Sequence, residues 1–263
     1  MRVGVISDVH SNHHALRRAL EELRCAGADI YVCVGDVVGY GAQPNECIAT
    51  LAELEAVVVA GNHDLMVLDA LADEHESDLV KASNTWTRGR LGRDSREYLA
   101  GLPMLATIGP LVVTHGSFES PECYVSRASA IDEQLDHLRR HYPDATGLVL
   151  GHTHRPMLHD ASRHERPRGS STFRLGHTPA LVNPGSVGQS REFELRPLVR
   201  FALIDLDDGA VTYFATPYDA RAARETLRRE HLSRAALHLV PGRYAGKARD
   251  IRQRALRMVR LLK

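Results

Sequence analysis

Two side chains of the metal-binding kind follow the first apolar run of the chain. The run at residues 3–6 is followed by Asp8 and His10, a carboxylate and an imidazole two residues apart. In an open α/β sheet, ligands bind beyond the carboxyl ends of the strands, so chemistry is expected at this point. In an extended segment, two side chains at this spacing point to the same side. The stretch therefore predicts a buried strand that delivers two metal ligands to a loop.

Four later apolar runs end in residues of the same kind. The runs at residues 30–34, 56–60, 111–113 and 147–150 are followed by Asp36, by Asn62 and His63, by His115, and by His152 and His154. A single histidine is more often a core or surface residue than a ligand, but packing does not explain eight such residues at strand ends. Oxygen and imidazole donors without thiolate suit Mn²⁺, Fe, Ni²⁺ or Zn²⁺.

Helices predicted between the strands would hold these loops in place. Ser11 is predicted to cap a helix in which the apolar residues from Ala15 to Leu23 have helical spacing. Pro44 suits the first turn of a helix that extends to residue 54. Another helix is predicted over residues 128–141. The first unit of the chain is thus strand, ligand loop and helix.

The later part of the chain predicts a hairpin and two terminal helices. Residues 199–204 and 210–214 are separated by Asp207-Asp208-Gly209 and predict an antiparallel hairpin. Residues 159–176 are polar, have no apolar period and are predicted to form an exposed loop. Helices are predicted near residues 220–239 and 246–262.

Residues 65–101 differ from their surroundings and predict a helical, charge-rich insertion. It contains the only tryptophan of the chain, Trp86, with several arginines nearby. A ring flanked by cations suits stacking on a nucleotide, so the insertion could be a lid over the site. The alternative is that Trp86 anchors the insertion to the core, because a lone tryptophan is commonly packed.

The net charge of zero conceals an uneven distribution. Residues 221–263 hold 13 of the 33 Lys and Arg but 3 of the 33 Asp and Glu, a net charge of +10, which leaves −10 in residues 1–220. The acidic part suits cation binding. The basic tail predicts a surface helix that packs on the body or on another copy of the chain, and attraction to nucleic acid is the alternative.

Length and composition predict a protein outside the membrane. A hydrophobic content of 43% in 263 residues is enough for one large α/β core. No apolar stretch approaches the roughly 20 residues that span a bilayer, so neither a signal peptide nor a membrane helix is expected. The four cysteines show no close pairing, which fits a reducing compartment and predicts a cytoplasmic location.

Five motifs, in order, resemble those of the calcineurin-like metallophosphoesterase superfamily, and most closely its bacterial and archaeal phosphodiesterase branch. The motifs are Asp8-Val9-His10, Gly35-Asp36, Gly61-Asn62-His63-Asp64, Thr114-His115-Gly116 and Gly151-His152-Thr153-His154. The resemblance implies a four-layer α/β/β/α sandwich over residues 1–218, with the helical insertion at about 65–101 and a basic helical extension at 219–263.

The resemblance also implies a centre of two divalent transition-metal ions, with Mn²⁺ expected first and Fe, Ni²⁺ or Zn²⁺ as alternatives. One ion would be bound by Asp8, His10, Asp36 and His154, and the other by Asp36, Asn62, His115 and His152. A bridging hydroxide would attack the phosphorus atom of a small phosphoester or nucleotide substrate. His63 would contact the phosphate and donate a proton to the leaving oxygen.

Departures from the motifs narrow the substrate. Ser/Thr protein phosphatases and dinucleoside tetraphosphatases carry an Asp three residues after the bridging Asp, with an Arg close behind, but this chain has Gly39 and Tyr40 there. Asp64 could support His63 instead, or could stabilise the turn. We therefore predict a phosphodiesterase. A nucleotide pyrophosphatase or phosphomonoesterase, a protein phosphatase, and a scaffold without activity are the alternatives.

Overall fold

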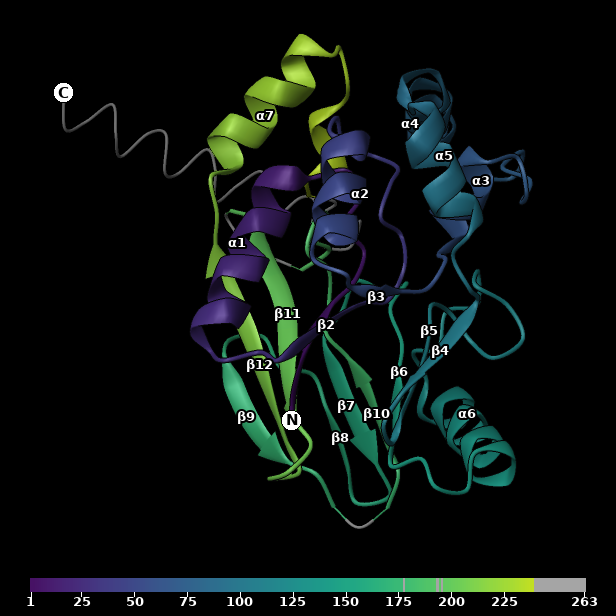
Figure 1. Ribbon diagram of the computed structural model, residues 1–263, viewed down its shortest axis with the longest axis vertical. Helices are drawn as coiled ribbons and strands as arrows, with labels where there is room; N and C mark the ends of the chain where they lie inside the picture. The colour runs from purple at the N-terminus through teal and green to yellow at the C-terminus, as the bar shows by residue number, and fades with distance from the viewer. Residues whose placement is uncertain (177, 193, 195, 239–263) are drawn as a thin grey trace, which may run out of the picture.

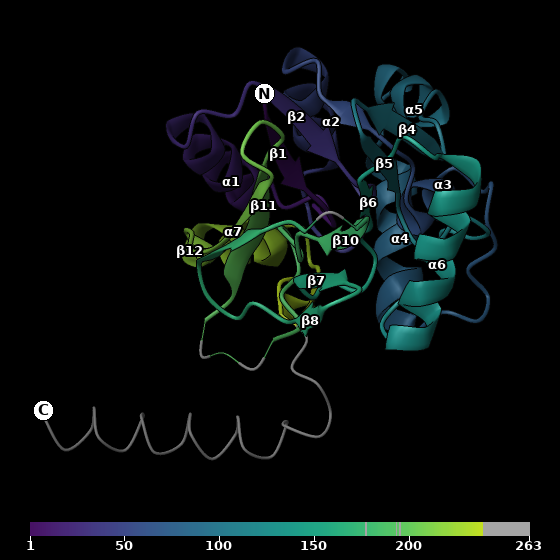
Figure 2. The same ribbon diagram turned by 90° about the horizontal axis from the view of Figure 1, so that it is seen from below.

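Two mixed β-sheets lie face to face between helices in the computed structural model (Figures 1 and 2). The structure describes residues 1–176, 178–192, 194 and 196–238. The helix predicted at residues 246–262 lies outside the described residues. None of the helices in the described part is long and apolar enough to cross a membrane.

The first sheet contains the first and the last strands of the described part of the chain. Its β1, β2 and β3 are parallel to one another, and β11, β12 and β9 continue the sheet in antiparallel pairing. In order across the sheet the strands are β3 (Val57–Val58), β2 (Ile30–Cys33), β1 (Arg2–Ile6), β11 (Leu198–Asp205), β12 (Ala210–Pro217) and β9 (Ser171–Arg174).

The second sheet is built mainly from the middle of the chain. Its β5, β6 and β10 are parallel, and β4, β7 and β8 join it in antiparallel pairing. In order across the sheet the strands are β4 (Leu105–Ile108), β5 (Leu111–Thr114), β6 (Gly147–Val149), β10 (Ala180–Asn183), β7 (Met157–Asp160) and β8 (Arg163–Glu165).

Alternation along the strands fills three apolar layers. Val3 and Val5 of β1 point into the core between the sheets, where they join Val113 and Val149, whereas Ile6 points to the helices. This period of two buries both faces of the strand. A Cβ atom on Gly4 would lie 3.1 Å from Leu23, so glycine lets the first helix pack closely on β1.

Helices cover the outer faces of both sheets, which confirms the predicted α/β/β/α arrangement. On the first sheet lie α1 (His13–Cys25) and α2 (Pro44–Glu53), and on the second lies α6 (Ala128–His141). Figure 2 shows α1 and α6 on opposite sides of the sheets. The insertion contributes α4 (Asp78–Arg90) and α5 (Arg93–Ala100), preceded by the short α3 (Asn62–Val67), and α7 (Ala220–Arg229) packs near α1.

The prediction of an exposed loop over residues 159–176 is wrong. This segment contains the end of β7, all of β8 and all of β9. β7 is buried because it pairs with β10, and β9 forms the edge of the first sheet by pairing with β12. Because β7 and β9 depend on partners far away in the sequence, their own residues show no local apolar period, which is why the pattern was misleading.

Two predicted helix ends also need correction. Asn12, not Ser11, caps α1, because its side-chain oxygen accepts a hydrogen bond from the backbone of Ala15. The helix predicted near residues 220–239 ends at Arg229 and is followed by a 3₁₀ turn at Arg234–Ala236. His231 adopts a left-handed conformation there, and the Leu232 N–H donates back to the Leu227 carbonyl, which closes the helix end.

Candidate metal centre

The fold brings the ends of five strands together and collects the predicted residues in two overlapping sets. One donor atom from each of Asp8, His10, Asp36 and His154 lies within 4.8 Å of the others, and the same holds for Asp36, His115 and His152. All of these residues are buried. Asp36 belongs to both sets, so the geometry can hold two metal ions that share one carboxylate.

The loops that carry these residues have an unusual backbone conformation. Asp8, His10, Asp36, His152 and His154 all have φ between 49° and 60°, in the left-handed region. Such a conformation costs about 1–2 kcal/mol for a residue other than glycine, and Asp and His tolerate it better than most. The prediction that Asp8 and His10 lie in an extended segment is therefore wrong, since β1 ends at Ile6. Their side chains converge because the loop turns sharply.

Backbone hydrogen bonds between distant segments hold the strained loops. The Asp8 N–H donates to Gly35 O at 3.1 Å, and the His10 N–H donates to Asp36 O at 2.9 Å. The carbonyl of Asp8 accepts from the Gly188 N–H at 2.9 Å. The first two ligand loops and the turn after β10 therefore form one rigid unit.

Two histidines of the first set direct their unprotonated nitrogens at each other. His10 donates its Nδ1–H to Val38 O at 3.1 Å, and His154 donates its Nδ1–H to Gln189 O at 2.8 Å. Burial holds the pKa of both rings well below the ordinary histidine value, so both are neutral. Their Nε2 atoms lie 3.1 Å apart, and two lone pairs at this distance repel unless a cation lies between them.

Asp8 belongs to the same set as His10 and His154, and its buried carboxylate would also be stabilised by a cation. Neither of its carboxylate oxygens accepts a hydrogen bond within the described residues, although the side chain is fully buried. Burial without such partners raises the pKa of Asp8 to about 7. A buried carboxylate needs a positive partner, so the donor chemistry of Asp8, His10 and His154 fits a divalent metal ion.

The second set favours a cation for a different reason. His115 donates its Nδ1–H to Val34 O at 2.6 Å, which leaves Nε2 3.3 Å from Asp36 Oδ2 and 3.2 Å from Asn62 Oδ1. Burial would lower the pKa of His115, but the Asp36 carboxylate raises it to about 9. The oxygens around Nε2 thus stabilise positive charge at this position.

His152 and Asn62 join the second set from two further elements. His152 donates its Nε2–H to Glu122 O at 3.0 Å, so its Nδ1 is the free donor atom, and burial lowers its pKa to about 3. Asn62 is the first residue of α3. The prediction that Asn62 and His63 lie in an extended turn is wrong, but successive helical residues still point in different directions.

His63 lies beside Asp36. Its backbone N–H donates to Asp36 Oδ1 at 2.9 Å, and its ring packs edge-on against His10 with centroids 4.9 Å apart. Its Nδ1 is buried and has no hydrogen-bond partner within the described residues. Burial lowers the pKa of His63, and the Asp36 carboxylate and the neighbouring Asn84 side chain on α4 act in the opposite direction. The Asn84 amide group donates to Asp73 Oδ2 at 3.2 Å. Asn84 is itself buried, with its Oδ1 unpaired in the described part of the chain.

Asp64 stabilises the turn rather than supporting His63. Its two carboxylate oxygens accept hydrogen bonds from the Val38 and Gly61 N–H groups, each at 3.0 Å. Gly39 lies too close to His63 to carry a side chain. A Cβ atom on Gly39 would lie 2.7 Å from His63 Nδ1, and its φ of 87° favours glycine.

Two residues that the sequence analysis did not single out also lie at the cluster. Arg191 donates from Nη1 to the hydroxyl oxygen of Tyr124 at 2.8 Å, and the Tyr124 ring packs on His152 with centroids 4.1 Å apart. The only sequence signal for Arg191 is its place directly after the turn at residues 183–190. Tyr124 has no comparable signal because it lies in an irregular segment before α6.

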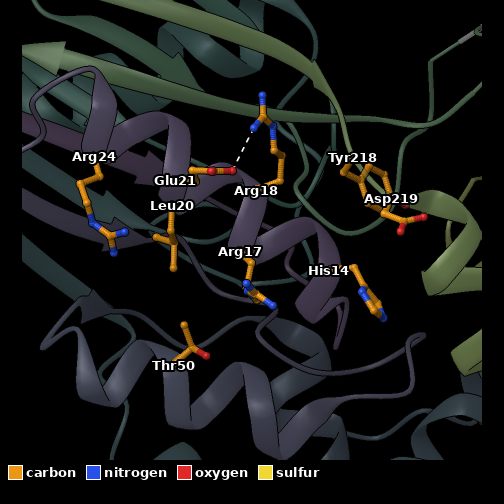
Figure 3. A pocket seen from close by; sticks show the side chains of 9 residues that line it. All are labelled: His14, Arg17, Arg18, Leu20, Glu21, Arg24, Thr50, Tyr218 and Asp219. Atoms are coloured by element: carbon orange, nitrogen blue, oxygen red, sulfur yellow. Dashed lines mark hydrogen bonds and ion pairs between the residues drawn. The ribbon is translucent and has the colours of Figure 1, made fainter.

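A separate cavity of about 510 Å³ lies away from the cluster, between α1, α2 and the segment before α7 (Figure 3). Its lining includes Arg17, Arg18 and Arg24, together with the acidic Glu21 and Asp219. Arg18 is paired with Glu21 and Glu22 in the described structure. The lining contains none of the clustered Asp and His residues, so this cavity is not part of the candidate metal centre.

Comparisons with known proteins identify relatives over most of the chain. Residues 1–209 match the family model described as the calcineurin-like phosphoesterase superfamily domain. The protein named Uncharacterized protein MJ0912, from Methanocaldococcus jannaschii, is 26% identical over 234 residues, which are 88% of this chain and 93% of that protein.

Solved structures show the same fold. A metallophosphoesterase from Sphaerobacter thermophilus superposes with a TM-score of 0.74 and 27% identity, over 90% of this chain and 96% of that one. The hypothetical protein PH1004 from Pyrococcus horikoshii OT3 gives a TM-score of 0.70 and 23% identity over the same shares of the two chains. At that identity the second comparison supports the fold alone.

Proposed function

The chain belongs to the calcineurin-like phosphoesterase superfamily, and we propose that it is a phosphodiesterase that uses two divalent metal ions. The observation that carries the proposal is the pair of donor sets that share Asp36, with the backbone N–H of His63 donating to that same carboxylate. A scaffold without activity would not need a proton donor at this position.

We assign the ligands by set. Asp8, His10, Asp36 and His154 would bind one ion, and Asp36, Asn62, His115 and His152 would bind the other. Two ions held in this way would polarise the phosphoryl oxygens of the substrate and would lower the pKa of a water molecule, which supplies a nucleophile at neutral pH. Mn²⁺ is the ion expected first, with Fe, Ni²⁺ and Zn²⁺ as alternatives, because the donors are oxygen and imidazole nitrogen.

The protein's own groups orient the site and move the proton. The carbonyls of Val38, Gln189, Val34 and Glu122 accept a hydrogen bond from one ring nitrogen of each of the four ligand histidines, so the other ring nitrogen of each is directed at the cluster. His63 donates a proton to the leaving oxygen. A phosphate anion beside the ring favours its protonated form and offsets the effect of burial.

The substrate class rests on the departures at Gly39 and Tyr40. The residues that Ser/Thr phosphatases use at these positions are missing, and Gly39 has no room for an acidic side chain against His63. This supports a small phosphodiester, nucleotides included, over a phosphoprotein. The four cysteines are unpaired, which supports a reducing, cytoplasmic location.

Turnover of a substrate panel tests the proposal. The full chain is loaded with Mn²⁺ and assayed with bis(p-nitrophenyl) phosphate, p-nitrophenyl phosphate, cyclic nucleotides, nucleoside triphosphates and a phosphopeptide. The highest kcat/KM is expected on a diester. A preference for nucleoside triphosphates or monoesters would indicate a pyrophosphatase or phosphomonoesterase, and one for the phosphopeptide a protein phosphatase. Absence of turnover with two ions bound would indicate a scaffold.

A further inference from the structure

Arg191 is a half-buried cation that has no carboxylate partner in the described structure. Its Nη1 donates to the Tyr124 hydroxyl at 2.8 Å and its Nε donates to Gln189 Oε1 at 3.2 Å, both neutral acceptors. Its Nη2 makes no hydrogen bond to any described residue. Holding a guanidinium out of bulk water without an anion is costly, so this arrangement calls for an anionic ligand.

The two residues that hold Arg191 each contact one of the donor sets. Gln189 accepts the Nδ1–H of His154 through its backbone carbonyl at 2.8 Å. Tyr124 packs its ring on His152. The guanidinium is therefore fixed beside both halves of the candidate metal centre, with one amino group unused.

The charge of Arg191 acts on the cluster. Burial lowers the pKa of His154 and the Arg191 guanidinium lowers it further. Burial likewise lowers the pKa of His10, His63 and His152, and in each of them Arg191 contributes in the same direction. The guanidinium therefore belongs to the same electrostatic environment as the candidate ligands.

We propose that Arg191, oriented by Tyr124, binds a non-bridging oxygen of the substrate's phosphate group. This inference rests on the proposed phosphoesterase function. Guanidinium groups bind phosphate oxygens in a fixed fork geometry, and the unused Nη2 supplies a donor for one. Position 40, where related phosphatases carry an arginine, holds Tyr40 in this chain. In this proposal Arg191, from a distant segment of the sequence, supplies the phosphate-binding cation that position 40 lacks.

Binding of inorganic phosphate to the metal-loaded full chain tests the proposal by calorimetry. Arg191→Gln is expected to raise the Kd for phosphate about 10- to 100-fold, the loss typical of a hydrogen bond between charged groups. Tyr124→Phe keeps the ring on His152 but removes the hydroxyl, so a smaller rise of a few-fold is expected. Arg140→Gln is the matched control, because Arg140 is exposed on α6.

Bound metal is measured in every variant. An unchanged Kd in Arg191→Gln with both ions bound overturns the proposal. If Arg191→Gln fails to load metal, Arg191→Lys decides, since it keeps the charge and loses the fork. An unchanged Kd in that variant also overturns the proposal, and a raised one supports it. A wild-type protein that does not bind phosphate would overturn it as well.

The same measurements separate this inference from the proposed function. A wild-type protein that binds phosphate through Arg191 but hydrolyses none of the esters contradicts the proposed function and leaves the phosphate site in place. If the wild-type protein hydrolyses esters and the Arg191→Gln variant has unchanged Kd and KM, the proposed function is supported. The role of Arg191 in phosphate binding is then contradicted.

Discussion

The Nε2 atoms of His10 and His154 lie 3.1 Å apart, although each ring donates its Nδ1–H to a backbone carbonyl and is neutral. Lone pairs that face each other at this distance are stable only around a cation. This relationship favours a divalent metal ion between the two rings, which the neighbouring Asp8 and Asp36 carboxylates could also bind.

Removal of metal should destabilise the fold. A ligand that binds the folded state alone adds about 2.7 kcal/mol of stability at one hundred times its Kd. Adding Mn²⁺ to the stripped protein should therefore raise Tm in a concentration-dependent way. Differential scanning calorimetry measures the shift, with Mg²⁺, which suits imidazole donors poorly, as the comparison. A Tm that Mn²⁺ leaves unchanged would contradict a metal ion at this position.

Asp36→Asn should reduce occupancy at both metal positions, because Asp36 belongs to both donor sets. His10→Ala should mainly affect one position. Elemental analysis of the purified variants gives the metal content per chain, and Asp94→Asn, an exposed change on α5, is the control. Two full equivalents retained by Asp36→Asn would show that this carboxylate is not shared.

His63→Ala should reduce kcat according to how much the leaving group needs a proton. An alkoxide leaves poorly without one, so a loss of about 10²- to 10⁴-fold is expected on a natural diester. A nitrophenolate leaves readily as an anion, so the loss on bis(p-nitrophenyl) phosphate should be smaller. Metal content should stay at the wild-type level. Equal losses on both substrates would leave His63 a positioning role only, and depleted metal would show that it is a ligand.

Asn84→Ala should lower kcat through His63. The Asn84 Oδ1 and the His63 Nδ1 are both buried and unpaired in the described structure, and Asn84 raises the pKa of His63, so the amide oxygen should stabilise the protonated ring and its loss should weaken the proton donor. One neutral hydrogen bond corresponds to roughly 5- to 10-fold in kcat. In the His63→Ala background the same change should have almost no effect. A loss of equal size in both backgrounds would indicate that Asn84 acts only on folding.

Trp86→Ala should lower stability and leave KM unchanged. Trp86 is half-buried on α4, with the Arg90 guanidinium 5.2 Å from the centre of its ring. Removal of a partly buried indole should cost about 1–2 kcal/mol, less than the loss for a fully buried one. Thermal unfolding and Michaelis constants measured on one preparation distinguish the two roles. A raised KM with an unchanged Tm would favour a lid.

The candidate ligands could be predicted from the sequence because each of them lies a few residues after an apolar run. A strand that is buried on both faces must be apolar, and its end must turn, so Asp8, Asp36 and His115 are marked by their immediate neighbours. The same local rule predicted the helices after Pro44 and over residues 128–141, whose observed bounds agree closely.

The roles that depend on distant segments were decided by the tertiary structure. Whether Asp64 supports His63 or the turn depends on where the Val38 N–H lies, and that is fixed by the packing of α3 against the loop after β2. β9 becomes a strand only because β12 offers it an edge. Arg191 reaches the cluster only because Tyr124 and Gln189 hold it there. Local sequence patterns reflect which residues are buried and where the chain turns. Contacts between segments far apart in the chain form only when the two sheets pack together.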